Sequence, residues 1–283
     1  MAASRIDDTF ARLRTDRQVG LVTYITAGDP DLPRSAEILT ALDRAGADVL
    51  EVGVPFSDPL ADGPVIQRAT ERALAAGGSL CATLALVAGI RGQVSAPIIV
   101  FSYVNPLLRM GIGIFARKAA SAGVDGVLAL DLPIEEAGEF RETLAASDLA
   151  TIFLLSPTTS EARIKKAAAL GRGFLYGISR LGVTGARDRV ASGAEALVRR
   201  IRAQTSMPIA LGFGISRPEH VAEIAGYADA AVVGSALVSL IADESGSSRL
   251  TERIAEYIRW LKGDDKGVSS RATVEQRLRP ARG

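Results

Sequence analysis

The sequence predicts one (β/α)8 barrel, a TIM barrel with extra helices, that spans residues 1–262. Eight short apolar runs alternate with helical patterns along the chain, which is the order of elements that a parallel barrel needs. The runs are apolar throughout rather than at every second position, as expected when both faces of a sheet are covered. A length of 283 residues fits a single barrel of this kind. An open, doubly wound sheet is the alternative that the same alternation allows.

Each strand is expected where a short apolar run stands between residues that favour turns. The predicted strands are residues 21–26, 49–54, 98–102, 126–129, 151–155, 174–177, 209–211 and 230–233. Between them, apolar side chains recur at helical spacing, as Ile38, Leu39 and Leu42 do. The predicted helices are residues 32–45, 112–122, 135–146, 161–170, 194–204, 218–225 and 250–261. Residues 70–94 exceed what one βα unit needs and predict the extra helices.

A glycine followed two or three residues later by an aspartate introduces three of the strands. These pairs are Gly46 and Asp48, Gly123 and Asp125, and Gly226 and Asp229. Glycine suits the position after a helix, and the aspartate opens the next strand. We interpret the pattern as part of the architecture and not as a binding motif. Residues 263–283 are polar and weakly periodic, so they are expected to form a flexible tail.

The composition excludes several classes of function. One His and one Cys cannot build a Cys/His zinc site or an internal disulfide, so we expect no bound metal. With 33 basic and 32 acidic side chains the net charge is +1, which gives no basic surface for nucleic acid. The N-terminus lacks the apolar core of a signal peptide, and glycine or proline interrupts the uncharged stretches 73–90 and 92–108. These features predict a cytoplasmic protein.

Three single residues have ordinary structural interpretations. Cys81 is expected to be a small buried hydrophobe. His220 stands at a predicted helix start and is expected at the surface or in a capping contact. Trp260 shares an apolar stripe with Tyr257 and is expected in the core. No lysine stands at the end of a predicted strand, which argues against a Schiff-base mechanism.

Catalytic groups of barrels lie at the C-terminal ends of strands and in the loops that follow. Glu51 is a carboxylate inside the apolar strand 49–54, where it shares a face with Val49 and Gly53. A bare carboxylate is costly to bury, so Glu51 needs a partner, a raised pKa or a catalytic task. On strand placement alone, a structural ion pair with a neighbouring strand is the alternative.

The loop after this strand, residues 55–64, holds three prolines and two aspartates, Asp58 and Asp62. Because proline restricts φ, the loop is expected to be stiff. Both aspartates could be ordinary turn residues. Their place directly beyond Glu51 supports a second interpretation, in which a carboxylate on the strand and one on the loop divide acid–base work from electrostatic work.

Glycine-rich stretches follow the last three predicted strands, at residues 179–185, 212–216 and 234–237. Glycine lets backbone N–H groups approach an anion, and a helix N-terminus adds a favourable dipole. Barrels often bind a substrate phosphate with the loops after the seventh and eighth strands, so the three stretches together predict a phosphate site. They are not a dinucleotide-binding fingerprint, because Arg217 occupies the third glycine position after Gly212 and Gly214.

Residues 50–64, with the sequence LEVGVPFSDPLADGP, resemble the signature of the tryptophan synthase alpha chain family. The similarity continues in order through TAGDP at 26–30, YVNP at 103–106, DLP at 131–133, SRLGVTG at 179–185 and GFGI at 212–215. It covers roughly residues 5–262, the whole predicted barrel. The resemblance implies cleavage of indole-3-glycerol phosphate to indole and D-glyceraldehyde 3-phosphate, in the last steps of L-tryptophan biosynthesis.

By this resemblance, Glu51 matches the acid–base carboxylate of the family, and Asp62 matches the carboxylate that binds the indole N–H. Tyr176 matches a tyrosine close to the reacting side chain. The chemistry agrees with these roles, because the indole ring leaves only after its C3 is protonated, and this protonation places positive charge near N1 that a carboxylate stabilises. A carboxyl of raised pKa can donate and accept a proton near neutral pH, which suits Glu51.

The resemblance also implies the rest of the site. Tyr24, Leu128 and Phe213 match positions of the indole pocket. Thr184 and Arg180 match the lid loop, in which Thr184 closes toward Asp62. The positions that match phosphate ligands are Gly185, Gly214, Gly234 and Ser235.

The family works as an α2β2 complex with a beta chain that carries pyridoxal phosphate. The resemblance therefore implies this partner and no cofactor in the present chain, and Asp58 with its loop matches the region that faces the beta chain. Three alternatives stay open: a stand-alone lyase with the same residues, a sugar-phosphate isomerase or epimerase on a similar barrel, and a non-catalytic binding module.

Overall fold

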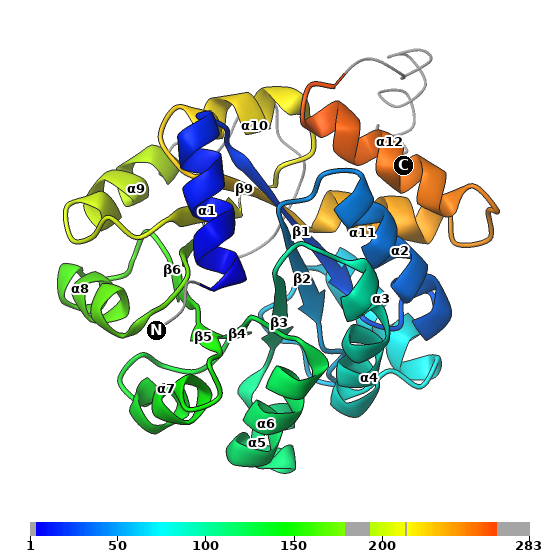
Figure 1. The fold of residues 1–283 in the computed structure, drawn as a ribbon, viewed down its shortest axis with the longest axis horizontal. Coiled ribbons are helices and arrows are strands. Elements are labelled where there is room, and N and C mark those ends of the chain that lie inside the picture. Colours follow the sequence, from blue (N-terminus) through cyan, green and yellow to red (C-terminus); the bar gives the residue numbers. More distant parts are fainter. Residues whose placement is uncertain (1–3, 179–192, 213, 265–283) are drawn as a thin grey trace.

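The structure is a computed structural model that describes residues 4–178, 193–212 and 214–264. Within these residues, parallel strands form a single sheet that curls into a nearly closed barrel, with helices around its outside (Figure 1). The predicted tail lies outside the described residues from position 265 onward.

The described strands follow one another around the barrel with every pair parallel. They are β1 Gly20–Thr26, β2 Val49–Gly53, β3 Ile98–Ser102, β4 Gly126–Ala129, β5 Ala150–Thr151, β6 Phe153–Leu155, β7 Leu175–Ile178, β8 Ile209–Gly212 and β9 Ala230–Val233. Their order in the sheet is β5-β4-β3-β2-β1-β9-β8-β7-β6. The predicted barrel is thus confirmed, and the open doubly wound sheet is not the arrangement that forms.

The described helices cover the outer face of this sheet and one of its ends. They are α1 Arg5–Asp16, α2 Leu32–Arg44, α3 Pro64–Ala75, α4 Leu80–Ile90, α5 Val104–Met110, α6 Ile112–Ala122, α7 Ala137–Ala145, α8 Glu161–Leu170, α9 Ala194–Arg202, α10 Pro218–Ala225, α11 Ser235–Asp243 and α12 Leu250–Leu261. The extra helical material predicted after the second strand is α3 and α4. All seven predicted helices form, four of them with the predicted boundaries.

The fifth strand was predicted as one run, residues 151–155, and this prediction is wrong. The chain forms two short strands there, and β5 pairs with β4 while β6 pairs with β7. Ile152 lies between them, and its N–H donates to the Val127 carbonyl at 2.9 Å. The segment 150–155 therefore pairs first with β4 and then with β7, and it joins the two edges of the sheet. The periodicity of apolar residues cannot show this division.

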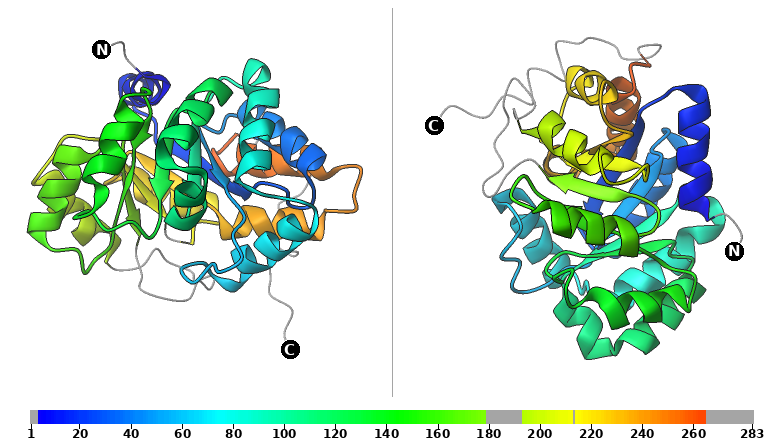
Figure 2. Two further views of the ribbon diagram at one scale, coloured as in Figure 1. Left: turned by 90° about the horizontal axis from the view of Figure 1, so that it is seen from below. Right: turned by 90° about the vertical axis from the view of Figure 1, so that its left-hand side faces the viewer.

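Helix α1 was not predicted, although its buried residues Ile6, Phe10 and Leu13 recur at helical spacing between charged residues. It begins with a capping box in which Ser4 and Asp7 satisfy each other's backbone N–H groups. Its buried face packs into the end of the barrel, where the Phe10 ring lies 5.5 Å from the Phe174 ring. Figure 2 shows α1 lying across one end of the barrel, so this end is closed.

The core has two layers, and they separate the two faces of each strand. Val49, Ile99 and Leu128 belong to a cluster inside the barrel, whereas Leu50 and Val52 belong to the larger cluster between the sheet and the helices. Since side chains alternate along a strand, Glu51 faces the barrel interior with Val49. The face of β2 that carries Val49 and Glu51 is therefore the one that points into the barrel.

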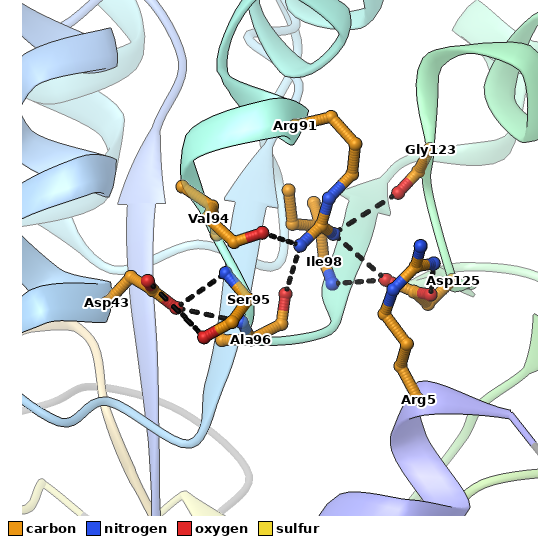
Figure 3. Close-up of polar contacts among 9 residues, drawn as sticks. All are labelled: Arg5, Asp43, Arg91, Val94, Ser95, Ala96, Ile98, Gly123 and Asp125. Carbon is orange, nitrogen blue, oxygen red and sulfur yellow. Dashed lines mark hydrogen bonds and ion pairs between the residues drawn. The ribbon is translucent and has the colours of Figure 1, made fainter.

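The three aspartates that open strands form the same contact at the closed end. Asp48, Asp125 and Asp229 each accept the backbone N–H of the first or second residue of the preceding strand, at 2.7–2.9 Å. Figure 3 shows Asp125, which also receives Arg5 from α1 and Arg91 from the segment after α4. The pattern is architectural, as expected, and it ties helices to strand starts.

One of the single-residue expectations needs correction. Cys81 is exposed rather than buried, because α4 turns its other apolar side chains inward. Of the two expectations for His220, the structure shows the capping contact: its side chain is buried, at 5% exposed, and its Nδ1 accepts the Ser216 N–H at 3.3 Å in front of α10. Trp260 lies in the core, as predicted.

No single helix in the described part of the chain is long and apolar enough to cross a membrane. Helices α3 and α4 with the turn after α4 satisfy the length and composition criteria only as a pair, bent by 88°. This pair is the covering that the barrel uses between β2 and β3.

Candidate functional site

Glu51 lies inside the barrel on β2 and is completely buried. Neither of its carboxyl oxygens has a hydrogen-bond partner among the described residues. Burial alone raises the pKa of Glu51 to about 8, because nothing nearby compensates the charged form. The alternative of a structural ion pair is therefore not what the described residues form.

Two tyrosines stand beside this carboxyl. Tyr176 on β7 and Tyr24 on β1 are both buried, and burial is the main reason that the pKa of each hydroxyl is raised. The charge of Glu51 adds to the increase in both pKa values. The site thus brings together Glu51, Tyr24 and Tyr176, as predicted, from three different strands.

Glycine makes room for both rings. The Tyr24 hydroxyl lies across β2, where a Cβ on Gly53 would overlap it. A Cβ on Gly212 would lie 2.9 Å from the Tyr176 hydroxyl. These two glycines were not predicted as site residues, although each follows apolar residues at the end of a strand.

Asp62 reaches the same region from the loop between β2 and α3. Its Oδ2 accepts a hydrogen bond from the Tyr103 hydroxyl at 3.0 Å, and Gln67 donates to its backbone carbonyl at 2.9 Å. Partial burial raises the pKa of Asp62 to about 6, while the Tyr103 hydrogen bond acts in the opposite direction. The charge of Asp62 also contributes to the raised pKa of Tyr24, which places Tyr24 within the influence of both carboxylates.

The side chains packed around Tyr24 inside the barrel are aromatic and apolar. Leu128 on β4 is fully buried in the inner cluster, in register with Phe101 on β3. The Phe101 ring meets the Tyr24 ring edge-on at 5.3 Å. Phe101 was missed from the sequence, and its position at the end of an apolar strand was the only available signal. Phe213 lies outside the described residues.

The predicted phosphate positions are described only in part. Gly234 immediately precedes α11, and Ser235 is the first residue of this helix. A Cβ on Gly234 would lie 3.7 Å from the Cβ of Tyr24, so this helix start adjoins the pocket. Gly214 has a φ of +71°, a conformation that favours glycine. Arg180, Thr184 and Gly185 lie outside the described residues.

Asp58 stands away from the carboxylates on the outer part of the 55–63 loop. It is exposed, and it accepts a hydrogen bond from the Ser57 hydroxyl at 2.6 Å. Leu60, two residues on, is 92% exposed, which is unusual for a large apolar side chain.

The site holds no obvious set of metal ligands. Among the described residues, no three His, Cys, Asp or Glu side chains are grouped so that they could hold a metal ion.

Comparisons with known proteins agree on one family. The family model for the tryptophan synthase alpha chain matches residues 10–263. The tryptophan synthase alpha chain of Geotalea daltonii is 51% identical over 248 residues, which are 88% of this chain and 94% of that one. The corresponding protein of Geotalea uraniireducens is 49% identical over 94% of this chain and 99% of its own length.

Solved structures show the same relationship. The tryptophan synthase subunit alpha of Legionella pneumophila superposes with a TM-score of 0.85 at 36% identity, over 93% of this chain and 98% of that one. A chain of Mycobacterium tuberculosis tryptophan synthase gives a TM-score of 0.86 at 37% identity, over 94% and 100%. Since the family model and the relatives each cover most of the barrel, the chain belongs to the tryptophan synthase alpha chain family.

Proposed function

We propose that Glu51 and Asp62 share the acid–base and electrostatic work of cleaving indole-3-glycerol phosphate. This cleavage, to indole and D-glyceraldehyde 3-phosphate, is the carbon–carbon lyase reaction of the alpha chain in tryptophan biosynthesis. The observation that carries the assignment is the fully buried Glu51 carboxyl, which has no hydrogen-bond partner among the residues that the structure describes. Buried polar groups are normally paired, so an unpaired carboxyl inside a barrel suits a task in catalysis.

In this proposal Glu51 alone makes both proton transfers of the reaction. Protonated Glu51 donates its proton to C3 of the indole, which leaves a positive charge on the ring near N1. The resulting carboxylate accepts the proton of the side-chain hydroxyl on the carbon attached to C3. As that hydroxyl becomes the aldehyde, the bond to C3 breaks and its electron pair returns to the ring. Glu51 regains its proton, and a raised pKa suits both transfers.

Asp62 has the complementary role in this proposal. Its pKa of about 6 leaves it ionised at neutral pH, so it can accept the indole N–H and stabilise the positive ring. Tyr176 stands beside Glu51 and would contact the reacting side chain. Asp62→Asn is expected to reduce turnover strongly while affinity for the phosphate end stays nearly unchanged. An unchanged rate would remove Asp62 from the mechanism.

The remaining site residues are proposed to bind the substrate. Tyr24, Leu128 and Phe213 would hold the indole. Tyr24 and Leu128 are both buried apolar or aromatic side chains, which supports this. Gly185, Gly214, Gly234 and Ser235 would bind the phosphate, supported by the start of α11 beside Tyr24. Thr184 and Arg180 would belong to a lid over Asp62.

The chain acts in a complex with the tryptophan synthase beta chain, and the pyridoxal phosphate of the complex belongs to that beta chain. We propose that the 55–63 loop with Asp58 faces the beta chain. We also propose a cytoplasmic location, where a phosphorylated substrate and a partner enzyme are available together.

The decisive experiment is an indole-release assay on indole-3-glycerol phosphate, with and without the beta chain. Release that rises strongly when the beta chain is added supports the proposal, and an equal rate without it supports a stand-alone lyase. No release under either condition would point to a different phosphate-binding barrel or to a binding module.

A further inference from the structure

Tyr103 lies immediately after β3 and contacts the loop that carries Asp62 at three points. Its hydroxyl donates to Asp62 Oδ2 at 3.0 Å and accepts the Ala61 N–H at 2.9 Å. Its ring lies 5.3 Å from the Phe56 ring at the other end of the same loop. A single buried side chain thus holds both the backbone and the carboxylate of this loop.

The backbone around Tyr103 is itself fixed. The Ser102 hydroxyl donates to the Tyr103 carbonyl at 2.8 Å, and the Val104 N–H donates to Asp131 Oδ1 at 2.7 Å. Asp131 belongs to the loop after β4. A chain of hydrogen bonds therefore joins the loops after three successive strands, and Tyr103 is its middle member.

We propose that Tyr103 is a positioning residue that fixes the Asp62 carboxylate for the indole N–H. The inference rests on the role proposed above for Asp62. Tyr103 occupies Oδ2, and Oδ1 forms no hydrogen bond among the described residues. With Oδ2 held by Tyr103, Oδ1 is the oxygen that we assign to the substrate N–H.

The physical reasons are geometric and electrostatic. A carboxylate on a loop can rotate and move with the backbone, and an N–H donor gains most from an acceptor already in place. A hydroxyl that donates to a carboxylate also favours its charged form. Tyr103 therefore acts through Asp62 rather than on the reacting bond.

The first test is Tyr103→Phe, which keeps the ring beside Phe56 and removes only the hydroxyl. We expect kcat at neutral pH to fall by about ten- to a hundredfold, the usual effect of losing a hydrogen bond to a charged group. The acidic limb of the kcat/KM profile should move to higher pH, because Asp62 loses the bond that favours its charge. Tyr227→Phe, which removes a hydroxyl from the outer surface of the barrel, is the matched control and should leave both unchanged. An unaltered rate and profile in Tyr103→Phe would overturn the proposal.

A double-mutant cycle separates positioning from direct contact. The readout is the affinity for a non-cleavable indole phosphate analogue, which stays measurable in inactive variants. Tyr103→Phe should weaken binding about three- to tenfold when Asp62 is present and have no further effect in Asp62→Ala, which leaves Tyr103 no side-chain acceptor at position 62. Equal effects in both backgrounds would mean that Tyr103 acts independently and would overturn the proposal.

The cycle also distinguishes this inference from the proposed function. Full turnover by Asp62→Asn alone would refute the role of Asp62, whatever Tyr103 does. If Tyr103→Phe does not fold, a ring-fluorinated tyrosine at position 103 decides the question. Its hydroxyl is a stronger donor, so the acidic limb should move to lower pH, and a limb that stays in place would refute the inference.

Discussion

Glu51 and Asp62 are both acidic side chains, yet their surroundings give them different charges at neutral pH. Burial without a partner raises the pKa of Glu51 to about 8, so its carboxyl keeps a proton. The pKa of Asp62 rises less, to about 6, because Asp62 is less buried and accepts the Tyr103 hydrogen bond. Two carboxyl side chains thereby supply an acid and an anion to the same site.

Glu51→Gln tests the first of these roles. The amide has nearly the same shape but cannot donate and accept the catalytic proton, so kcat should fall by about 10²- to 10⁴-fold. Affinity for a non-cleavable analogue, measured by calorimetry, should change little. The exposed Glu139→Gln on α7 is the control. Full turnover by Glu51→Gln would rule out the assignment.

The two pKa values predict a bell-shaped pH dependence. Asp62 has to be ionised, so kcat/KM should fall below about pH 6, and Glu51 has to be protonated, so kcat/KM should fall above about pH 8. Initial rates of indole release between pH 5 and 9 check this. In Asp62→Asn the acidic limb should disappear, and a limb that persists would belong to another group.

Glu51 should also make the stability of the fold depend on pH. Its pKa is raised from 4.5 to about 8 in the folded chain, so folding takes up a proton between these values. The free energy of unfolding should therefore decrease as pH rises from about 4.5 to 8, by an amount of the order of a few kcal/mol.

Urea unfolding at pH 5 and pH 8, for the natural sequence and for Glu51→Gln, measures this effect. Asp62 contributes with the same sign up to about pH 6 but is present in both proteins, so the difference isolates Glu51. Parallel pH dependence in the two proteins would contradict the expectation.

At the scale of single residues, alternation along a strand was enough to place Glu51 on one face with Val49, and the inner face follows once the barrel is known. The bond between Tyr103 and Asp62 could not be predicted, because it depends on how two loops 41 positions apart meet. The exposure of Cys81 was predicted wrongly for a similar reason. It depends on which side of α4 faces a neighbour, and the apolar sequence of α4 gives no polar side from which to decide.

The repeated glycine–aspartate pattern makes the same hydrogen-bonded contact between neighbouring strands at three places in the barrel. Each aspartate uses its backbone N–H and its carboxylate to bond one residue at the start of the preceding strand, as Asp125 does with Ile98. A cation then completes each carboxylate, and for Asp125 these cations are Arg5 and Arg91 (Figure 3). The pattern therefore sets the register between neighbouring strands and attaches the helices to it.

Asp125→Asn tests this function. The amide keeps one acceptor oxygen but loses the charge opposite Arg5 and Arg91, in a site only 7% exposed. We expect a loss of about 2–4 kcal/mol in the free energy of unfolding, seen as a lower urea midpoint with an unchanged slope. The exposed Asp243→Asn should change stability by less than about 0.5 kcal/mol. Equal free energies of unfolding for the two variants would show that the ion pairs of Asp125 do not stabilise the fold.

The sequence predicted which strands and helices form more reliably than the residues at which each begins and ends. Strands such as β3 and helices such as α6 form with the predicted boundaries, since glycine and proline mark their limits. Helix α5 was missed because its seven residues are too few to show a period. The division between β5 and β6 was missed because it follows from closing the barrel, which is a property of the whole sheet.

At the scale of the whole molecule, the two ends of the barrel have separate functions. The end where the strands start is closed by α1 and by partly buried ion pairs such as Arg12 with Asp48. The other end carries the carboxylates and the loops, among them the stiff 55–63 loop. Changes at the closed end should alter stability, and changes at the open end should alter activity or partner binding.

The exposed tip of that loop leads to the prediction for the complex. Leu60 is 92% exposed in the isolated chain, and an apolar side chain so placed gains free energy when a partner covers it. Leu60→Ser should therefore raise the beta-chain concentration that half-saturates the stimulation of indole release, by about tenfold. The unfolding midpoint of the isolated chain should stay the same, because Leu60 packs against little. Leu74→Ser on α3 is the matched control, since Leu74 is also partly exposed but belongs to a helix rather than to the loop. If Leu60→Ser and the natural sequence respond to the beta chain at the same concentrations, this loop does not face the partner.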